Sequence, residues 1–236
     1  MAARPVTDGP EALAQVELLR DLLPPDRASI AERCRFRRYR PQQPIIELED
    51  ERCDVYFLLS GRVRVTYFSV SGREVSFGDR GPGQVFGELA AIDGKARSAT
   101  VVALTECSVA SLPAAEFRAL LAHHERIADA VLRHLAAKVR LLTERVVEFS
   151  TLAVRNRIHA ELLRLAQAGT PLAKGAAISP APTHADIASR ISTHREAVTR
   201  ELAELARAGL VVKRGGDLVV PDLAALARMV EDMRGE

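Results

Sequence analysis

The first half of the chain carries the short, alternating apolar runs that are typical of β-strands. In RVRVTYF, the side chains of Val63, Val65 and Tyr67 alternate with polar ones, as in a strand with one buried face. Similar runs, DVYFLL, EVSFG, SATVVAL and CSVASL, occur between residues 44 and 112, separated by glycine-containing breaks such as SGR and RGPGQ. The pattern predicts a compact antiparallel β-domain, a small barrel or roll, preceded by two short helices around a Pro-Pro break.

A different pattern follows between residues 113 and 149, where the apolar positions take the spacing of a long helix. The seam has the 4-3-4-3 spacing of heptad a and d positions and consists of Ala128, Leu132, Leu135, Val139, Leu142, Val146 and Phe149. At 1.5 Å per residue this helix would be roughly 50 Å long, which is more than a small domain can cover. A helix packed on its own domain would also have an apolar face, but the length of the seam favours a coiled coil between two copies of the chain.

After residue 151 the sequence predicts a second, mainly helical domain. It contains a helix in VRNRIHAELLRLAQA, a loop in GTPLAKGAAISPAP, two further helices, a β-hairpin in LVVKRGGDLVV and a terminal helix in DLAALARMVEDM. Gly215 and Gly216 stand between two apolar runs, which is a hairpin signal.

Within this domain, THADIASRISTHREAVTRELAELARAGLV has the pattern of a helix-turn-helix. Thr183 and Asp186 can cap a first helix, IST is the turn, and Thr193 or His194 opens a second helix. The inward faces of the two helices would consist of Ile187, Ala188, Ile191, Val198, Leu202 and Leu205. In such a motif the second helix lies in the major groove of DNA, with its N-terminal residues on base edges.

The residues that would face DNA are polar and locally basic. At the start of the second helix they are His194, Arg195, Glu196, Thr199 and Arg200. Arginine can donate two hydrogen bonds to guanine, and a carboxylate can accept from cytosine. The alternative role for Glu196 is structural, because it could complete a capping box with Thr193 or orient Arg200; the roles can coexist. Lys213 and Arg214 in the hairpin suit DNA phosphates, which carry no sequence information.

In the first half, the stretch FGELAAIDGKARSATV has the residues of an anion pocket. Arg97 supplies a donor fork for a phosphate, and the Ser98 hydroxyl with the Ser98 and Ala99 amides could complete the pocket. Glu88 can accept a hydrogen bond from a ribose hydroxyl, while Gly87 lets the backbone come close to a ligand. The residues alone leave this reading open against a surface ion pair between Glu88 and Arg97 across a turn.

Several other classes of protein are not expected. The three cysteines, Cys34, Cys53 and Cys107, are odd in number and widely spaced, which predicts reduced thiols and no metal cluster. All six histidines lie outside residues 44–112, and no Ser/His/Asp or Cys/His set stands within one segment, so neither a metal site in the roll nor an enzyme is predicted. No apolar run approaches the roughly 20 residues that span a bilayer, and no signal-peptide pattern begins the chain. We therefore expect a cytoplasmic protein that does not contact a membrane.

The order of these parts resembles the Crp/Fnr family of bacterial transcription regulators, from about residue 15 to 225. HREAVTR is similar to the recognition helix of that family, and FGELAAIDGKARSATV is similar to the phosphate-binding cassette of cyclic-nucleotide-binding domains. The resemblance implies an α+β protein with a β-roll sensor in residues 1–115, a dimerisation helix in 116–150 and a winged helix-turn-helix in 151–236. Iron–sulfur members have an N-terminal cysteine cluster, which this chain lacks.

The resemblance also implies a ligand, partners and site residues. The ligand would be a cyclic nucleotide acting as an allosteric effector without a metal, and the residues that match the cassette are Gly87, Glu88, Leu89, Arg97, Ser98 and Ala99. Leu142 and Thr143 align with two hydroxyl-bearing residues that reach adenine in the enterobacterial catabolite activator; Thr143 retains one hydroxyl, and we expect cAMP rather than cGMP. A homodimer would read a palindrome with TGTGA-like half-sites through Arg195, Glu196 and Arg200, with RNA polymerase as a further partner. Two alternatives remain: a ligand-independent regulator with a vestigial pocket, and a cyclic-nucleotide module that does not bind DNA.

Overall fold

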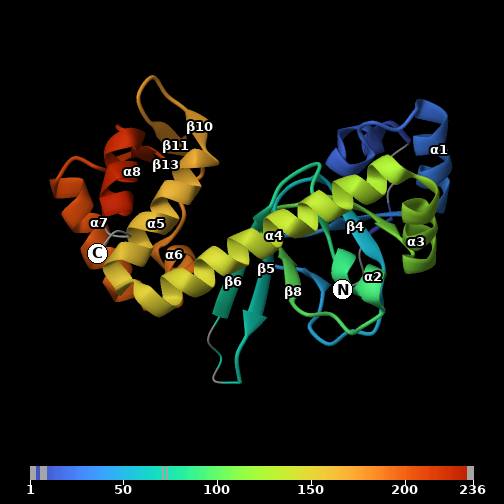
Figure 1. Cartoon of the computed structure of the whole chain (residues 1–236), viewed down its shortest axis with the longest axis horizontal. Helices are drawn as coiled ribbons and strands as arrows, with labels where there is room; N and C mark the ends of the chain where they lie inside the picture. Colours follow the sequence, from blue (N-terminus) through green and yellow to red (C-terminus); the bar gives the residue numbers. More distant parts are fainter. Residues whose placement is uncertain (1–3, 6–9, 71, 73, 233–236) are drawn as a thin grey trace. The chain divides into compact units, whose positions relative to one another are not determined.

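A computed structural model of the chain, shown in Figure 1, describes residues 4–5, 10–70, 72 and 74–232. Its residues group into two compact units. The first comprises residues 1–68 and 77–139, and the second residues 69–76 and 140–236, as far as these are described. This division reflects which residues lie close together in space and does not show that either unit folds on its own. The domain limits at residues 115 and 150 therefore stay predictions.

The first unit contains two antiparallel sheets with an apolar layer between them, except that residues 74–76, the start of one strand, belong to the second unit. The strand order is β1-β2-β9-β4-β7 in one sheet and β3-β8-β5-β6 in the other. The strands are β1 (Arg4–Pro5), β2 (Arg35–Tyr39), β3 (Pro44–Ile46), β4 (Val55–Ser60), β5 (Val63–Phe68), β6 (Glu74–Arg80), β7 (Val85–Phe86), β8 (Thr100–Ala103) and β9 (Cys107–Leu112). The predicted antiparallel roll is confirmed, and each of the five apolar runs that predicted it contributes a strand.

Strand β4 is buried on both faces, which explains its continuous apolar sequence. Tyr56 and Leu58 belong to the layer between the sheets, whereas Val55, Phe57 and Leu59 pack in a second cluster with helices. Because side chains alternate between the two faces of a strand, both sets must be apolar when neither face meets water. The helical elements in that second cluster include η1 (Pro10–Gln15), η2 (Glu17–Leu19), α1 (Pro24–Arg33) and α3 (Ala114–His123).

The long helix predicted over residues 113–149 is in fact two helices, α3 and α4 (Glu125–Thr151). They are separated at His124, whose backbone is extended, with φ −126° and ψ 91°. Phe117 of α3 and Ile127 of α4 are both buried in the cluster on the helical face of β4. Packing of both helices onto one core therefore overrides the local helical preference at the junction. The Pro-Pro pair also differs from expectation, because it forms the first turn of α1, where a missing N–H costs no hydrogen bond.

Five of the seven predicted seam residues lie exposed on α4, whereas Ala128 is half-buried and Leu135 packs partly against the core of the first unit. Leu132, Val139 and Val146 are 66%, 63% and 63% exposed, and Leu142 and Phe149 are exposed as well. A row of apolar side chains in water is what a helix presents before it pairs with another helix. The coiled coil between two copies stays a prediction.

The second unit contains a helical core and one small sheet. Its elements after α4 are α5 (Val154–Gln167), β10 (Thr170–Pro171), β11 (Ala176–Ile178), α6 (His184–Arg190), α7 (Arg195–Arg207), β12 (Val212–Arg214), β13 (Asp217–Val220) and α8 (Leu223–Asp232). The hairpin of β12 and β13 is confirmed, with Val212 opposite Val219. The predicted inward residues of α6 and α7 are all buried.

The segment predicted as a loop after α5 forms part of the sheet. Strands β10 and β11 extend the hairpin to four strands in the order β10-β11-β13-β12. Ala176 lies opposite Val220, and a Cβ atom on the preceding Gly175 would stand only 1.9 Å from the Val220 carbonyl oxygen. The glycine that suggested a flexible loop is therefore required for close strand contact.

Candidate functional site

The cassette residues form a turn, a short helix and a buried arginine. Strand β7 ends at Phe86, Gly87 adopts a left-handed backbone with φ 77°, and helix α2 (Glu88–Asp93) follows. A Cβ atom at Gly87 would stand 2.8 Å from Nη1 of Arg97. Glycine is needed there both for its backbone angle and for the approach of Arg97.

Arg97 is 4% exposed and held in place by backbone carbonyls. Its Nη1 donates to the carbonyl of Gly87 at 2.8 Å and its Nη2 to the carbonyl of Asp54 at 2.6 Å. The guanidinium lies 5.5 Å from the centroid of the Tyr56 ring, which stacks on Phe86. Among the described residues no carboxylate lies within 4.0 Å of Arg97, and Asp50 acts on it only from farther away, so backbone carbonyls orient its charge and no ion pair neutralises it.

Glu88 is equally buried, at 2% exposed, but it pairs with α4. The Lys138 ammonium donates a hydrogen bond to Glu88 Oε1, and Nε2 of His134 lies 3.8 Å from the same oxygen. Burial alone would raise the pKa of the Glu88 carboxyl, but His134 and Lys138 outweigh it and hold the pKa at about 2. The alternative of a surface ion pair between Glu88 and Arg97 is therefore wrong.

These side chains line one pocket of about 80 Å³. The six cassette residues Gly87, Glu88, Leu89, Arg97, Ser98 and Ala99 all lie in its wall. The wall also contains apolar Ile46, Val65, Phe86 and Val101 and the basic residues Arg80 and Lys138. Three cationic side chains, Arg80, Arg97 and Lys138, stand against one carboxylate, Glu88, so the pocket has an excess of positive charge. Such a wall suits an anion attached to an apolar or aromatic body.

Sequence reasoning did not predict Lys138 as part of this wall. It also assigned two residues to the ligand, Leu142 and Thr143, that the wall does not contain. Lys138 lies between seam positions, where a lysine is ordinarily solvated, and only the long-range contact with Glu88 reveals its role. Leu142 and Thr143 are exposed on the part of α4 that belongs to the second unit, and they are not among the residues of this pocket.

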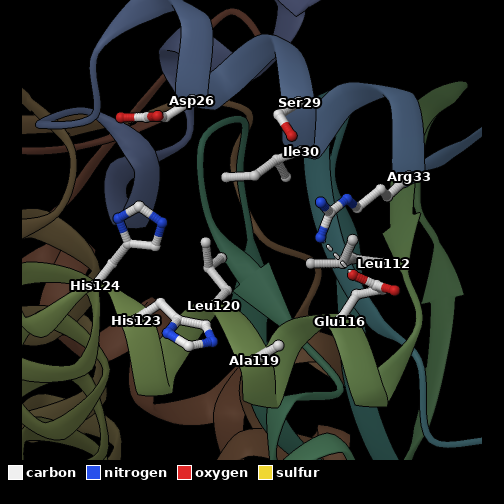
Figure 2. A pocket seen from close by; sticks show the side chains of 10 residues that line it. All are labelled: Asp26, Ser29, Ile30, Arg33, Leu112, Glu116, Ala119, Leu120, His123 and His124. Atoms are coloured by element: carbon white, nitrogen blue, oxygen red, sulfur yellow. Dashed lines mark hydrogen bonds and ion pairs between the residues drawn. The ribbon is translucent and has the colours of Figure 1, made fainter.

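A larger hollow, of about 200 Å³, lies between α1 and α3 (Figure 2). Arg33 and Glu116 form an ion pair of 2.7 Å at one end, and Asp26 and His124 stand at the other. The side chains of Arg33 and Glu116 are 55% and 39% exposed, so water already solvates their charges. This hollow is larger than the cassette pocket, but the buried Arg97, which has no ion-pair partner among the described residues, makes the smaller pocket the stronger candidate for ligand chemistry.

Three further features of the described residues concern metal ligands, thiols and apolar helices. No group of His, Cys, Asp and Glu side chains among them could hold a metal ion. The three cysteines are free, as predicted. None of the described helices is long and apolar enough to cross a membrane.

The predicted reading motif has the expected helices, turn and cap. Thr183 and Asp186 form the capping box of α6, with hydrogen bonds of 3.1 and 2.9 Å. Ser192 in the turn has a positive φ of 52°. Helix α7 begins at Arg195, and its N-cap residue His194 makes no side-chain cap hydrogen bond.

The side chains that would face DNA are exposed, and one of them has an internal role. His194, Arg195, Glu196 and Arg200 on the recognition helix, and Lys213 and Arg214 on β12, are all exposed. In the described part of the chain, Glu196 has neither the capping partner nor the contact with Arg200 that the structural alternative requires. The Thr199 hydroxyl hydrogen-bonds Nδ1 of His184 at 2.7 Å and donates to the Arg195 carbonyl, which ties the two helices together.

Comparison with known proteins identifies a family for each half of the chain. A cyclic nucleotide-binding domain model matches residues 36–124, and a Crp-like helix-turn-helix domain model matches residues 156–229. The chain is 31% identical to the cAMP-activated global transcriptional regulator Vfr of Pseudomonas aeruginosa, over 79% of this chain and 89% of that protein. It is 30% identical to the cyclic AMP receptor protein of Thermus thermophilus, over 86% of this chain and 92% of that protein. A solved CRP-family regulator from Thermus thermophilus superposes with a TM-score of 0.66 at 31% identity, covering 82% and 96% of the two chains.

Proposed function

The chain belongs to the Crp/Fnr family of DNA-binding transcriptional regulators, and from this premise we propose that cAMP controls its binding to DNA. Both matched domains and the named relatives are those of regulators and not of enzymes. The effector is a cyclic nucleotide, cAMP in preference to cGMP, and it acts on a cytoplasmic homodimer that recruits RNA polymerase.

The observation that carries this proposal is the buried charge of Arg97. The exocyclic phosphate of a cyclic nucleotide has one negative charge and would supply the counter-ion that the described residues do not provide. Ser98, beside it in the same wall, adds a hydroxyl donor. Glu88 is fixed in its ionised form and can accept a hydrogen bond from the ribose 2′-hydroxyl. The apolar Ile46, Val65 and Val101 give the sugar and base a dry surface.

The preference for cAMP rests on residues outside this wall. Thr143 keeps one of the two hydroxyls that the family resemblance assigns to adenine, and Leu142 does not. Several relatives, including that of Pseudomonas aeruginosa, are named as cAMP-activated regulators.

The proposed dimerisation rests on the seam of α4, and the proposed reading of DNA rests on the N-terminal residues of α7. The exposed seam of α4 supports pairing with a second copy, which would remove its apolar side chains from water. Two recognition helices about 34 Å apart would then enter successive major grooves of a palindrome with TGTGA-like half-sites. Arg195, Glu196 and Arg200 would contact bases, while Lys213 and Arg214 would contact phosphates. cAMP shifts the equilibrium between two arrangements of these helices by its difference in affinity for them.

The test is titration calorimetry with cAMP and with cGMP, followed by DNA binding in the presence of each nucleotide. We expect cAMP to bind more tightly and to strengthen binding to a palindromic duplex. Arg97→Leu should abolish the nucleotide effect, and Arg133→Leu, at an exposed arginine, should retain it. DNA binding that ignores both nucleotides would favour a vestigial pocket. A protein in which Arg195→Ala leaves the DNA complex unchanged would favour a regulatory module that does not read DNA.

A further inference from the structure

A cluster of buried charges joins three helices of the second unit. Its centre is Glu161 of α5, which is 1% exposed. Arg145 of α4 and Arg190 of α6 each contact this carboxylate at 3.3 Å, and Arg164 of α5 contacts it at 3.1 Å. Arg164 also contacts Glu148 of α4 at 2.8 Å. A single carboxylate is thus shared by arginines from three different helices.

Arg145 holds α6 in two ways. Besides its contact with Glu161, its Nη1 donates a hydrogen bond of 3.0 Å to the backbone carbonyl of Arg190. Arg190 is the last residue of α6, where helix carbonyls lack partners within the helix and a cation is favourable. Arg145 therefore fixes the C-terminal end of α6 directly, and through Glu161 it fixes the side chain of the same residue.

The two residues of this contact, Arg145 and Arg190, are each close in sequence to one of the two proposed sites. Arg145 follows Thr143 by two residues on the same helix, and Arg190 precedes Arg195, the first residue of α7, by five. The turn between them is constrained, because Ile191 is 1% exposed and the Thr193 amide donates to the Ala188 carbonyl at 3.0 Å. A displacement of α4 at Arg145 would be carried to α7 through α6 and a turn that cannot absorb it.

Stability alone does not account for such a cluster. Burying charges costs free energy, and well-packed apolar residues often stabilise a fold as well as a buried ion pair does. Burial lowers the pKa of Arg145 although Glu161 and Glu148 favour its charged form, which is consistent with that cost. What a multi-centred charge cluster adds is a defined orientation of the helices, because each arginine accepts few arrangements of its partners.

We propose that Arg145, Glu161 and Arg190 are positioning residues that couple the dimer helix α4 to the recognition helix α7. The inference rests on the proposed function and adds the connection through which nucleotide binding changes DNA affinity. In the described part of the chain Arg145 contacts Glu161 and the carbonyls of Arg190 and Ser76, none of which belongs to the pocket wall or to α7, so it acts through Arg190 and not on either ligand.

The decisive variant is Arg145→Lys, which keeps the charge but cannot span both the Arg190 carbonyl and Glu161 with one planar group. Three quantities are measured: the Kd for cAMP without DNA, the Kd for a palindromic duplex without cAMP, and the same Kd with saturating cAMP. We expect the cAMP Kd to change less than about threefold. The ratio of the two DNA Kd values should fall at least about tenfold relative to the wild-type chain. Arg133→Lys on the same helix, at an exposed ion pair, should leave the ratio unchanged.

A purely structural role would give another result, since DNA affinity would then fall equally with and without cAMP and the ratio would be preserved. That result would overturn the inference. Glu161→Gln, which retains the shape and one acceptor oxygen, is measured in parallel with its thermal unfolding, so the test stands if Arg145→Lys does not fold. If wild-type protein binds cAMP and responds to it but both variants keep the full ratio, only the coupling role is wrong. A wild-type chain that does not respond to cAMP would overturn the proposed function and this inference with it.

Discussion

Arg97 in the first unit and Arg145 in the second are both buried arginines, at 4% and 9% exposed, but their charges are treated differently. Arg97 is held by the carbonyls of Gly87 and Asp54, which orient it without neutralising it. Arg145 contacts the carboxylate of Glu161. Burial of an arginine therefore does not by itself indicate a ligand site. A cation that the fold orients but does not neutralise indicates an anionic ligand, and one with a buried carboxylate indicates a structural or coupling role.

The largest effect is expected from removing the carboxylate that Arg145 shares. Glu161→Leu leaves three arginines without it, and breaking a buried pair costs roughly 3–5 kcal/mol of unfolding free energy. Urea unfolding at neutral pH measures the loss. Glu204→Leu, at a mostly exposed ion pair on α7, should cost less than about 1 kcal/mol. A loss below that value for Glu161→Leu would contradict the assignment of a buried, interdependent cluster.

The second effect concerns ligand affinity rather than folding. Arg97→Leu should weaken cAMP binding by about 100-fold or more, because two charge-assisted hydrogen bonds to the phosphate are lost. Without nucleotide its unfolding free energy should change by less than about 1 kcal/mol, since the variant also removes a buried charge that lacks a counter-ion. Calorimetry and urea unfolding of one preparation test both halves. A destabilisation as large as that of Glu161→Leu would place Arg97 with the structural arginines.

A third test concerns the pH dependence of stability, which we expect from His159 beside the Glu201 carboxylate. Glu201 and Glu88 each have one histidine and one cation nearby. Glu201 on α7 contacts His159 at 2.6 Å and Arg155 at 3.1 Å, whereas Glu88 contacts Lys138 with His134 further away. Burial lowers the pKa of His159 below its usual 6.5, although the Glu201 carboxylate acts in the opposite direction. The unfolded chain then takes up a proton more readily than the folded chain. Stability should therefore be full above pH 6.5 and decrease as the pH falls below it.

Thermal unfolding of the whole chain from pH 7.5 to about 5 measures this dependence. His159→Gln should flatten the profile below pH 6.5, and His123→Gln, at an exposed position in the first unit, should keep the wild-type profile. The assignment is wrong if His159→Gln retains the full loss of stability in acid.

The smallest effect is expected where an arginine is neither buried nor shared. Arg133 pairs with Asp129 at 2.8 Å on the surface of α4, with side chains 78% and 56% exposed. Arg133→Ala should cost less than about 0.5 kcal/mol, because solvent screens exposed pairs along a helix. If Arg133→Ala cost as much unfolding free energy as Glu161→Leu, burial would not explain why the pair of Arg145 matters more than the pair of Arg133.

Local pattern was enough to predict the roll and the helix-turn-helix, whereas the cassette was favoured over a surface ion pair only through the family resemblance. Alternation in RVRVTYF depends only on neighbours in the chain, and the capping box of Thr183 and Asp186 spans three residues. The cassette residues lie within one short stretch, so their meeting in one wall follows from the turn at Gly87. Features of this kind are visible in sequence because their partners are close in sequence.

Features that depend on distant partners were not predictable in the same way. Arg97 is held by a carbonyl 43 residues away, and Lys138 reaches a glutamate 50 residues earlier. The break at His124 has no proline or glycine signal, because it arises from the packing of two helices onto one core. Strand β11 has no strand signal in the sequence, because its small residues fit close contact with β13 and have little β-preference of their own.

The paired state of Glu88 has a consequence for signalling fidelity. With a pKa of about 2, this carboxylate keeps the same charge between about pH 5 and 8, the range in which cells alter their acidity. The hydrogen-bond acceptor that the pocket would offer to the ribose of the proposed ligand is therefore a constant. A regulator built in this way would register the abundance of its effector without confusing it with a change in proton concentration.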